Sequence, residues 1–366
     1  MLAAYLEQKV LGIFQDHDFT PEGSPSLSVL ESLIVAQSTD VDLSIIEASP
    51  VSILPESCLI DTLSPSCPDE DDEDELNRLV HQLDIKILNE RVKTDDLEEQ
   101  IRKEMLQNPV PYEKREESVC ISVDDVGAKK QKESRKPKSS DPPGQSKRKY
   151  VQNTVIHVEQ GARSYILNGY GIWRVLRLLL AFLLNNNLLS HHWVFFVDGY
   201  SLYSSVVQYF CWHPQLSVIL DWYHLKKKCR ELLSMASKGS KIRNAILEEL
   251  MPLLWHGLVD QAIDYLSHIA TDQIKNDDEL KHLMGYLEKN RGMIPVYAVR
   301  RELGLRNSSN RGEKANDLLV AARQKHNGMS WSKSGSVALA YVTALKKNRT
   351  YKTWFRKREL ELKLVS

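Results

Sequence analysis

The chain has 366 residues, 42% of them hydrophobic, and a net charge of −1. This length is too great for one compact domain and fits two or three segments with a sizeable core. Residues 1–118 carry 9 Lys and Arg against 27 Asp and Glu, a charge of −18, whereas residues 119–366 carry 39 against 22, a charge of +17. Solubility alone explains the net charge but not the separation of acidic and basic residues along the chain. The basic part therefore favours a polyanion partner such as nucleic acid.

Cysteine usage and hydropathy argue against a secreted or membrane-spanning protein. The five cysteines are scattered and never paired as C-x-x-C, which indicates a reducing compartment. Glu7 and Lys9 interrupt the first apolar stretch, which is unlike a signal peptide. The most apolar run, Leu178–Leu184, is far shorter than the ~20 residues of a membrane span. We expect a cytoplasmic, nucleoid-associated protein without membrane contact.

Residues 1–117 are expected to form an acidic, mostly helical amino-terminal region with a linker at 62–75. The linker ends in the acidic run Pro68–Glu75, which is typical of a solvated segment. Leu76–Leu106 has apolar residues every three to four positions, which predicts one long or two short amphipathic helices. Such a helix serves either in docking or dimerisation, or simply packs on the catalytic domain.

The pattern changes to strands at residue 118. A strand that runs into Asp124-Asp125 is followed by a basic loop, a hairpin around Gln160-Gly161, and a helix. The loop carries no apolar periodicity, and we expect it to be disordered without a ligand. The predicted ranges are Val119–Val123 for the strand, 129–149 for the loop, Tyr150–Val158 and Arg163–Leu167 for the hairpin, and Trp173–Leu189 for the helix.

Two short apolar runs then stop at aspartates. Trp193–Val197 ends at Asp198, and Leu216–Leu220 ends at Asp221. Runs of about five β-branched or aromatic residues predict strands buried on both faces. The stretch between them has helical spacing, so the unit is strand–helix–strand with parallel strands. Chemistry in open α/β sheets sits at the carboxyl ends of strands, so the two aspartates suggest a metal site.

The remainder is helical by pattern. Asn307 to Asn310 offer four capping residues in a row before the last long helix, and the tail beyond it is basic and aromatic. The predicted helices are Leu225–Ala236, Lys241–Trp255, Val259–Ala270, Asp277–Glu288 and, after a connection at Arg291–Leu303, Arg311–His326.

This order of elements predicts an α/β fold with an RNase H-like core, a mixed five-stranded sheet with flanking helices. The core comprises 118–224 and 301–366, separated by an all-helical insertion at 225–300. In that topology the strand ending at Asp198 lies beside the first strand, so Asp198 meets Asp124. A third carboxylate must come from the last helix, and Glu313 stands in its first turn. Three converging carboxylates need cations between them, which favours two Mg²⁺ ions, replaceable by Mn²⁺, for phosphodiester chemistry.

Five segments together resemble a bacterial insertion-sequence transposase of the DDE class. They are VCISVDDVGAKKQK, YVQNTVIHVEQGARSYILNG, WVFFVDGY, LSVILDWYHLKK and NSSNRGEKANDLLVAARQKHNGMSWS. The chain is similar to the subgroup shared with Mutator-like elements, in which a C/D-x-x-H motif follows the second catalytic Asp and an all-helical insertion precedes the Glu. The resemblance covers roughly residues 118–355.

The resemblance implies roles for specific residues. Asp124, Asp198 and Glu313 are the implied metal ligands, Asp221 and His224 form the D-x-x-H motif, and Asp125 is the alternative first ligand. The implied activity is cleavage of double-stranded DNA at terminal inverted repeats and transfer to target DNA by the freed 3′-hydroxyl, by an oligomer on DNA. Alternatives are an RNase H-like nuclease that cuts without joining, and an inactive transposase-derived DNA-binding protein. Because residues 1–117 show no DNA-recognition motif, a truncated copy is a further interpretation.

Several candidates also have purely structural interpretations. Asp198 can start a turn, Glu313 can close a capping box with Asn310, and Asp221 with His224 can hold the insertion onto the sheet rather than position DNA. Cys211, His213, His224 and Cys229 are ligand types of tetrahedral zinc, but their spacing matches no zinc finger, and buried free cysteine is the alternative. Trp331 either stacks on an unpaired base or anchors a helix end. The expected DNA-binding residues are Lys129, Lys130, Lys132, Arg311, Lys314, Lys325, Trp331 and Lys333.

Overall fold

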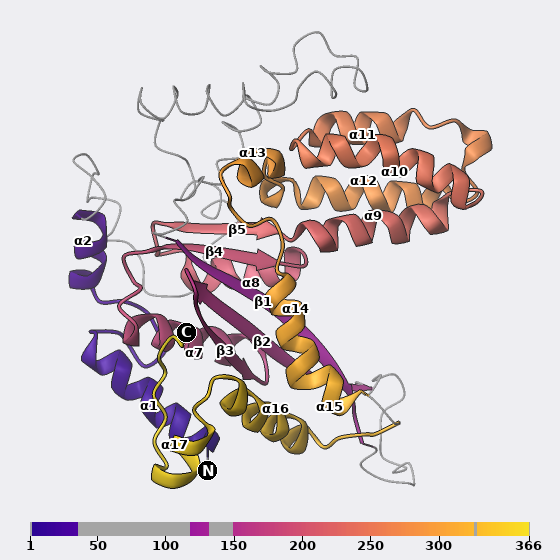
Figure 1. Cartoon of the computed structure of the whole chain (residues 1–366). Coiled ribbons are helices and arrows are strands. Elements are labelled where there is room, and N and C mark those ends of the chain that lie inside the picture. Colours follow the sequence, from indigo (N-terminus) through magenta and orange to yellow (C-terminus); the bar gives the residue numbers. More distant parts are fainter. Residues whose placement is uncertain (1, 36–117, 132–148, 326–327, 366) are drawn as a thin grey trace, which may run out of the picture.

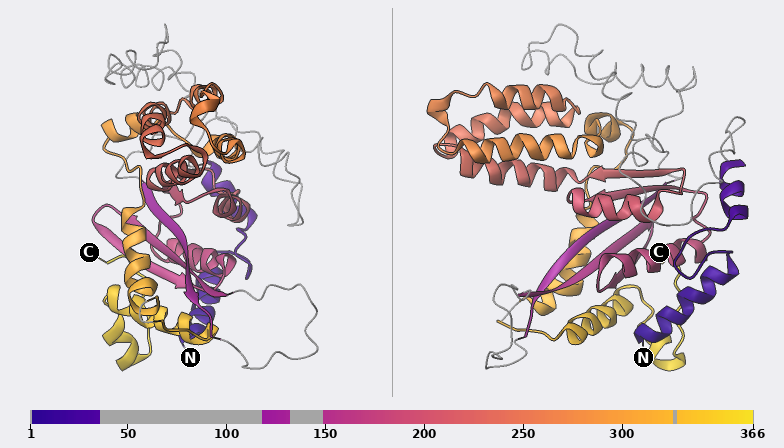
Figure 2. Two further views of the ribbon diagram at one scale, coloured as in Figure 1. Left: turned by 90° about the vertical axis from the view of Figure 1, so that its right-hand side faces the viewer. Right: turned by 180° about the vertical axis from the view of Figure 1, so that it is seen from behind.

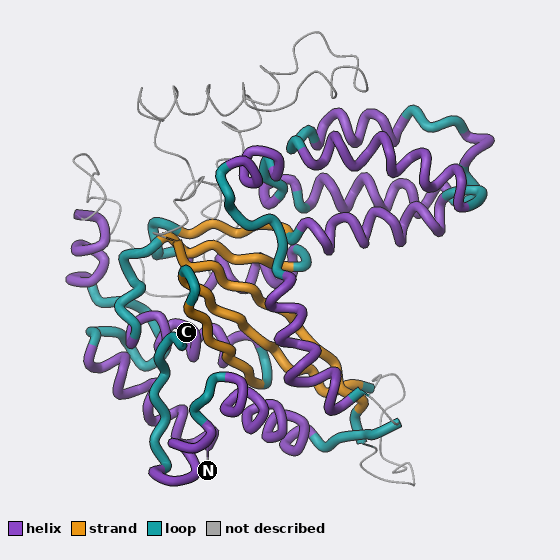
Figure 3. The backbone as a smooth tube through the Cα atoms, in the orientation of Figure 1, coloured by secondary structure: helices purple, strands orange, loops and turns teal. Residues whose placement is uncertain are grey.

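The computed structural model describes residues 2–35, 118–131, 149–325 and 328–365, in which a mixed five-stranded sheet carries helices on both faces (Figure 1, Figure 3). The strand order is β3-β2-β1-β4-β5. The first three pair antiparallel, and β1, β4 and β5 pair parallel. The strands are β1 (Ser118–Lys129), β2 (Tyr150–Gln160), β3 (Arg163–Gly169), β4 (His192–Val197) and β5 (Leu216–Leu220). The predicted α/β, RNase H-like class is confirmed.

Strand β1 is longer than predicted and does not end at Asp124. Its antiparallel pairing with β2 continues to Lys129, which lies opposite Tyr150. Its parallel pairing with β4 ends earlier, at Ser122 opposite Phe196. The hydrogen bonds of β2 therefore carry β1 past the aspartates, and Asp124 lies within a strand where its parallel neighbour stops.

The two faces of the sheet are covered by different helices. Helices α7 (Ile172–Asn185) and α8 (Tyr200–Phe210) pack on the face that carries Ile121 and Val123. Helices α14 (Asn310–Asn316) and α16 (Lys333–Lys347) pack on the opposite face, over Val126 and Val155. This division follows from the alternation of side chains along a strand.

The carboxy-terminal part differs from its prediction in two ways. The last long helix is not uniform, because a π-helical turn, η4 (Asp317–Ala321), separates α14 from α15 (Ala322–Gln324). The tail, expected only to be basic and aromatic, forms α16 and α17 (Tyr351–Lys357). Ser332 caps α16, since its hydroxyl accepts a hydrogen bond from Gly335 N.

The all-helical insertion projects beyond β5, away from the rest of the sheet (Figure 2). The expected connection at Arg291–Leu303 is partly helical, with η3 (Arg291–Met293) and α13 (Tyr297–Glu302). The Tyr297 ring lies fully buried between Trp222 and Trp255, which anchors the insertion at its base. The insertion helices are α9 (Trp222–Ala236), α10 (Ser240–Trp255), α11 (Val259–Ser267), η2 (Thr271–Gln273) and α12 (Asp277–Lys289).

Only residues 2–35 of the expected acidic region are described, as α1 (Leu2–Asp16) and α2 (Leu27–Val35). Helix α1 packs on α7 and on the chain end, where the Tyr5 hydroxyl accepts a hydrogen bond from Leu360 N. The expected linker at 62–75, the amphipathic stretch Leu76–Leu106 and most of the basic loop lie outside the described residues. Within the described ranges, no helix is both long and apolar enough to cross a membrane.

Candidate active site

The parallel register of β1 and β4 brings Asp124 and Asp198 together. The last pair of this ladder is Ser122 opposite Phe196, and each aspartate stands two residues further along the chain. Side chains two residues apart on a strand share a face, so both carboxylates follow the face of Ser122. The structure thus bears out the predicted meeting of residues that are 74 positions apart in the sequence.

The two aspartates of the Asp124-Asp125 doublet lie on opposite faces of the sheet and have different partners. The Asp124 carboxylate accepts a hydrogen bond from Asn316 Nδ2 on α14. Asp125 is exposed, and its Oδ1 accepts a hydrogen bond of 2.5 Å from the Thr154 hydroxyl. Consecutive strand residues point to opposite faces, so Asp124 is the member of the doublet that faces α14.

The pKa values of Asp124 and Asp198 are both raised, chiefly by burial. Burial raises the pKa of Asp124 to about 6, with the charge of Asp198 adding to the rise and His224 opposing it. Asp198 is exposed at the carboxyl end of β4, yet the protein around it removes enough water to raise its pKa too. His224 opposes this rise, and the charge of Asp125 adds to it. Such a pair favours a bound cation over two free charges.

Helix α14 approaches β1 without a side chain between them. A Cβ atom on Gly312 would stand 2.6 Å from Ser122 Cβ, so only glycine permits this separation. Four residues later, Asn316 reaches Asp124. The backbone of residue 313 lies between these two contacts, next to the strand that carries Asp124. The Glu313 side chain itself lies outside the described part, so its role as third ligand stays a prediction.

The described side chains at this site offer oxygen ligands that suit a hard cation. Asp124 and Asp198 supply carboxylate oxygens, and the buried Oδ1 of Asn316 has no hydrogen-bond partner. Among the described residues, no three His, Cys, Asp or Glu side chains are placed to hold a metal ion. Asn316 was not predicted as a site residue, although its spacing from Glu313 places both on one side of the helix.

Asp221 is a structural clamp at the start of the insertion. It is 1% exposed, and its carboxylate accepts hydrogen bonds from Tyr223 N and His224 N, which cap α9, and from Ser309 N before α14. Burial alone would raise its pKa, but the hydrogen bonds from His224 and Ser309 outweigh burial and lower it. His224 Nδ1 lies 3.6 Å from Asp221 Oδ1. The structural interpretation of Asp221 is thus supported, while the charge of His224 also lowers the pKa values of Asp124 and Asp198.

The insertion adds two groups that the sequence analysis missed. The buried Tyr286 hydroxyl on α12 has no hydrogen-bond partner, and its pKa is raised by burial and by charges that include Asp198 and Asp221. Lys289 Nζ, at the end of the same helix, lies 4.4 Å from the centroid of the Tyr200 ring, two residues after Asp198. Tyr286 and Lys289 could not be predicted from the local sequence, because only the tertiary fold brings α12 close to Asp198 and Tyr200.

The zinc interpretation is wrong, because its four residues do not converge. The His213 ring stacks on Trp193 at 3.7 Å, and its Nε2 donates a hydrogen bond of 2.7 Å to Leu189 O. Cys229 is fully buried in α9, where burial raises its pKa to about 12, and Cys211 donates its S–H to Gln208 O. Buried free cysteine is the correct interpretation of Cys229.

The expected DNA-binding residues fall into three groups. Lys129, Lys314, Lys325 and Lys333 are exposed. Trp331 is half-buried, and its indole N–H donates to Gln324 O at 3.2 Å, which favours the anchoring interpretation. The backbone of Trp331 also bridges to Lys130 beside the basic loop. Lys132 and the side chain of Arg311 lie outside the described residues.

A family model described as "Uncharacterised protein family (UPF0236)" matches residues 163–361, which is more than half of the chain. The match begins at β3 and extends through Asp198, the insertion and α16 to the residues after α17. No curated protein and no solved structure matches the chain.

Proposed function

The chain belongs to this uncharacterised family, whose description assigns no activity, and we propose from the site itself that it is a metal-dependent DNA-cleaving enzyme of the DDE transposase type. The observation that carries the proposal is the meeting of Asp124 and Asp198 at the carboxyl end of β4 in an RNase H-like sheet. The family resemblance of the sequence motifs adds strand transfer by a 3′-hydroxyl.

In this proposal Asp124, Asp198 and Glu313 hold two Mg²⁺ ions, with Asn316 as an adjacent oxygen donor. When bound there, Mg²⁺ supplies activation of the attacking oxygen and stabilisation of the leaving oxygen. The protein's own part is to hold two repelling carboxylates at a fixed separation on strands β1 and β4, so that little reorganisation is needed on metal binding. Asp221 orients the start of α9, which turns His224 toward the same carboxylates and presents a donor for a phosphate oxygen.

The substrate class follows from charge. The part of the chain from residue 119 carries +17, and exposed lysines of β1, α14 and α16 lie on or beside the helices that flank Asp124. Such a surface binds the phosphate backbone without reading sequence. We propose double-stranded DNA as the partner, with a homo-oligomer assembled on paired DNA ends, in the cytoplasm at the nucleoid.

The test is cleavage of a labelled duplex that carries the DNA flanking the gene, with Mg²⁺ or Mn²⁺. Asp198→Asn and Asp124→Asn should reduce cleavage to background and leave duplex binding in Ca²⁺ largely intact. Asp264→Asn is the matched control, because this exposed carboxylate lies on α11, in the part of the insertion that projects from the sheet (Figure 2). Continued cutting by Asp198→Asn would show that the active-site assignment is wrong.

The same reaction separates the proposal from its alternatives. Joined products, in which the labelled 3′ end is linked to a second duplex, identify a transposase. Cut ends without joining identify an RNase H-like nuclease. Duplex binding without cutting by the unaltered chain identifies a DNA-binding protein derived from a transposase.

A further inference from the structure

A cavity that none of the proposed metal ligands lines lies between α1, the start of α7 and α16. Its volume is about 250 Å³, and it adjoins an open groove of about 620 Å³ with which it shares Tyr170, Arg174 and Tyr341. The groove has the size of ordinary small-ligand sites. None of the residues proposed to hold metal lines either space.

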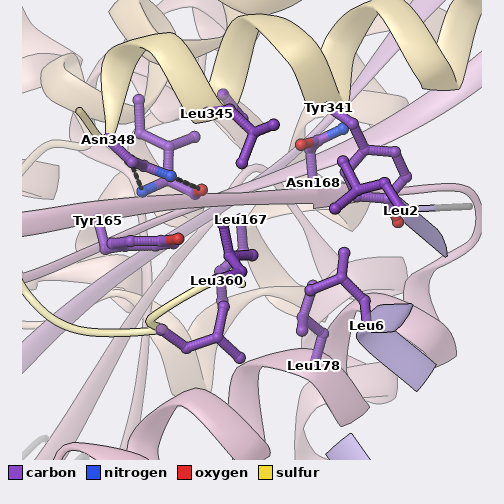
Figure 4. A pocket seen from close by; sticks show the side chains of 13 residues that line it. Leu2, Leu6, Tyr165, Leu167, Asn168, Leu178, Tyr341, Leu345, Asn348 and Leu360 are labelled. Carbon is purple, nitrogen blue, oxygen red and sulfur yellow. Dashed lines mark hydrogen bonds between the residues drawn. The ribbon is translucent and has the colours of Figure 1, made fainter. Parts of the chain in front are cut away.

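The inner chamber contains an amide without partners. Asn168 on β3 is 1% exposed, and neither its Nδ2 nor its Oδ1 makes a hydrogen bond. Figure 4, a close view of a smaller neighbouring cavity that Asn168 also lines, shows its amide beside the Tyr341 ring. A buried polar group without partners costs about 1–3 kcal/mol, and folded proteins rarely leave both atoms of an amide unsatisfied. A ligand that offers one donor and one acceptor would satisfy both atoms.

Basic side chains line both the chamber and the groove; of these, Arg177 Cζ lies 5.6 Å from the Phe14 ring centroid and Lys333 Nζ lies 3.6 Å from the Tyr170 ring centroid. Arg174 and Arg177 line the chamber, and Lys333 and Arg358 line the adjoining groove. The Nε of Arg177 is buried without a hydrogen-bond partner. Helix α7 begins here with no side-chain cap and no acidic residue in its first turn, which leaves backbone N–H groups for an anion. One carboxylate is also present, Glu7, which lies 3.8 Å from Arg174 Nη2.

These groups match the parts of a nucleotide. An Asn amide pairs in bidentate fashion with the N6 and N7 edge of adenine. The Tyr341 ring supplies an apolar wall, and guanidinium groups with a helix amino terminus suit a phosphate. We propose that the chamber binds an adenine nucleotide, with the base edge on Asn168 and the phosphate toward Arg174 and the groove. The ligand is either a free nucleotide or an unpaired adenine in a DNA strand.

The sheet places this chamber near the candidate active site. Asp124 lies opposite Val155, and Val155 lies opposite Asn168, so the three residues form one row across β1, β2 and β3. Two strand spacings of ~4.8 Å put Asn168 at roughly 10 Å from Asp124 along the sheet. Binding of an unpaired adenine in DNA rests on the proposed function, whereas binding of a free nucleotide does not.

The test is binding by the full chain in metal-free buffer, so it is independent of cleavage. The probes are deoxyadenosine monophosphate, deoxycytidine monophosphate, inorganic phosphate, and a thymine-only single strand with or without one adenine. Asn168→Leu keeps the volume and removes both polar atoms. It should weaken adenine binding by on the order of tenfold to a hundredfold, while the unfolding temperature stays equal or rises.

A second pair of variants tests the phosphate end without touching the core. Lys333→Ala should weaken binding severalfold at low salt, and Lys347→Ala, at the opposite end of α16, should not. Adenine-dependent binding of the mononucleotide identifies a free nucleotide as ligand, and adenine-dependent binding of the strand alone identifies DNA. Equal binding by Asn168→Leu and the unaltered chain, equal binding of all probes, or no binding of any probe would overturn the inference.

Discussion

The close approach of Gly312 on α14 to Ser122 on β1 predicts how Gly312→Ala changes the free energy of unfolding, which depends on two opposing effects. Replacing Gly312 by Ala improves helix propensity by at most about 1 kcal/mol. The new methyl group would stand 2.6 Å from Ser122 Cβ, whereas carbon atoms in contact lie at ~3.5–4.0 Å. Both atoms are fixed to the backbone, so no rotamer relieves the clash, and overpacking of this kind costs about 1–3 kcal/mol. We expect Gly312→Ala to destabilise the protein by about 1–2 kcal/mol.

A second substitution isolates the cause. Ser122→Gly removes the atoms that the new methyl group would meet, and the next nearest atom, Ser309 Cβ, is at an ordinary 3.7 Å. Ser122→Gly alone should cost up to about 1 kcal/mol as a glycine in a strand. Combined with Gly312→Ala, it should recover stability, with a coupling free energy of about 1–2 kcal/mol in a double-mutant cycle.

The assay is urea unfolding followed by fluorescence and circular dichroism, with the slope of the transition checked for each variant. Metal-dependent cleavage should follow the same order as stability, because α14 also carries Glu313 and Asn316. If Gly312→Ala is as stable as the unaltered chain, or if Ser122→Gly gives no rescue, α14 does not lie on β1 as described.

Three further outcomes are expected. In the same urea assay, Asp221→Ala should lower the free energy of unfolding by about 3 kcal/mol, because backbone N–H groups of α9 and Ser309 lose their acceptor. The control, Asp264→Ala, should lower it by under about 0.5 kcal/mol. Equal effects of the two variants would contradict the structural role of Asp221. The pKa of Asp124 is about 6 in the folded protein, above its value in the unfolded chain, so its ionised carboxylate destabilises the metal-free protein above pH 6. Protonation as the pH falls through 6 removes this destabilisation. It also removes a charge that binds Mg²⁺, so the Mg²⁺ affinity should fall over the same pH range. Titration calorimetry at several pH values checks this, and a pH-independent affinity would refute it. Cys229 should resist alkylation in the native protein and react on unfolding, as followed by peptide mass mapping; rapid native labelling would show that α9 is packed differently.

The sheet and the first two carboxylates were accessible from the sequence because both depend on strong local signals. Five-residue apolar runs that end in aspartate predicted β4 and β5, and the order of elements predicted which strands are neighbours. The parallel register then follows from the topology, so Asp198 meets Asp124 although the sequence holds them apart.

Other features depend on contacts that have no local signal. The amide of Asn316 was overlooked because its partner, Asp124, lies 192 residues earlier. Helix α16 was missed because it begins with Lys-Ser-Gly-Ser and its buried residues are small apart from Leu345, which gives weak apolar periodicity. The full length of β1 was missed because hydrogen bonds from β2, rather than the residues of β1, continue the strand past Asp125.

The helical insertion leaves the core and returns to it at almost one point. Trp222 N, its first residue, donates a hydrogen bond of 3.0 Å to Asn307 O, and Asp221 reaches Ser309 N. The two ends of this segment of over eighty residues therefore lie next to each other, so a change in its length need not disturb the sheet. Related chains are free to lengthen, shorten or exchange this module while β5 and α14 keep their positions, provided that the closing contacts survive.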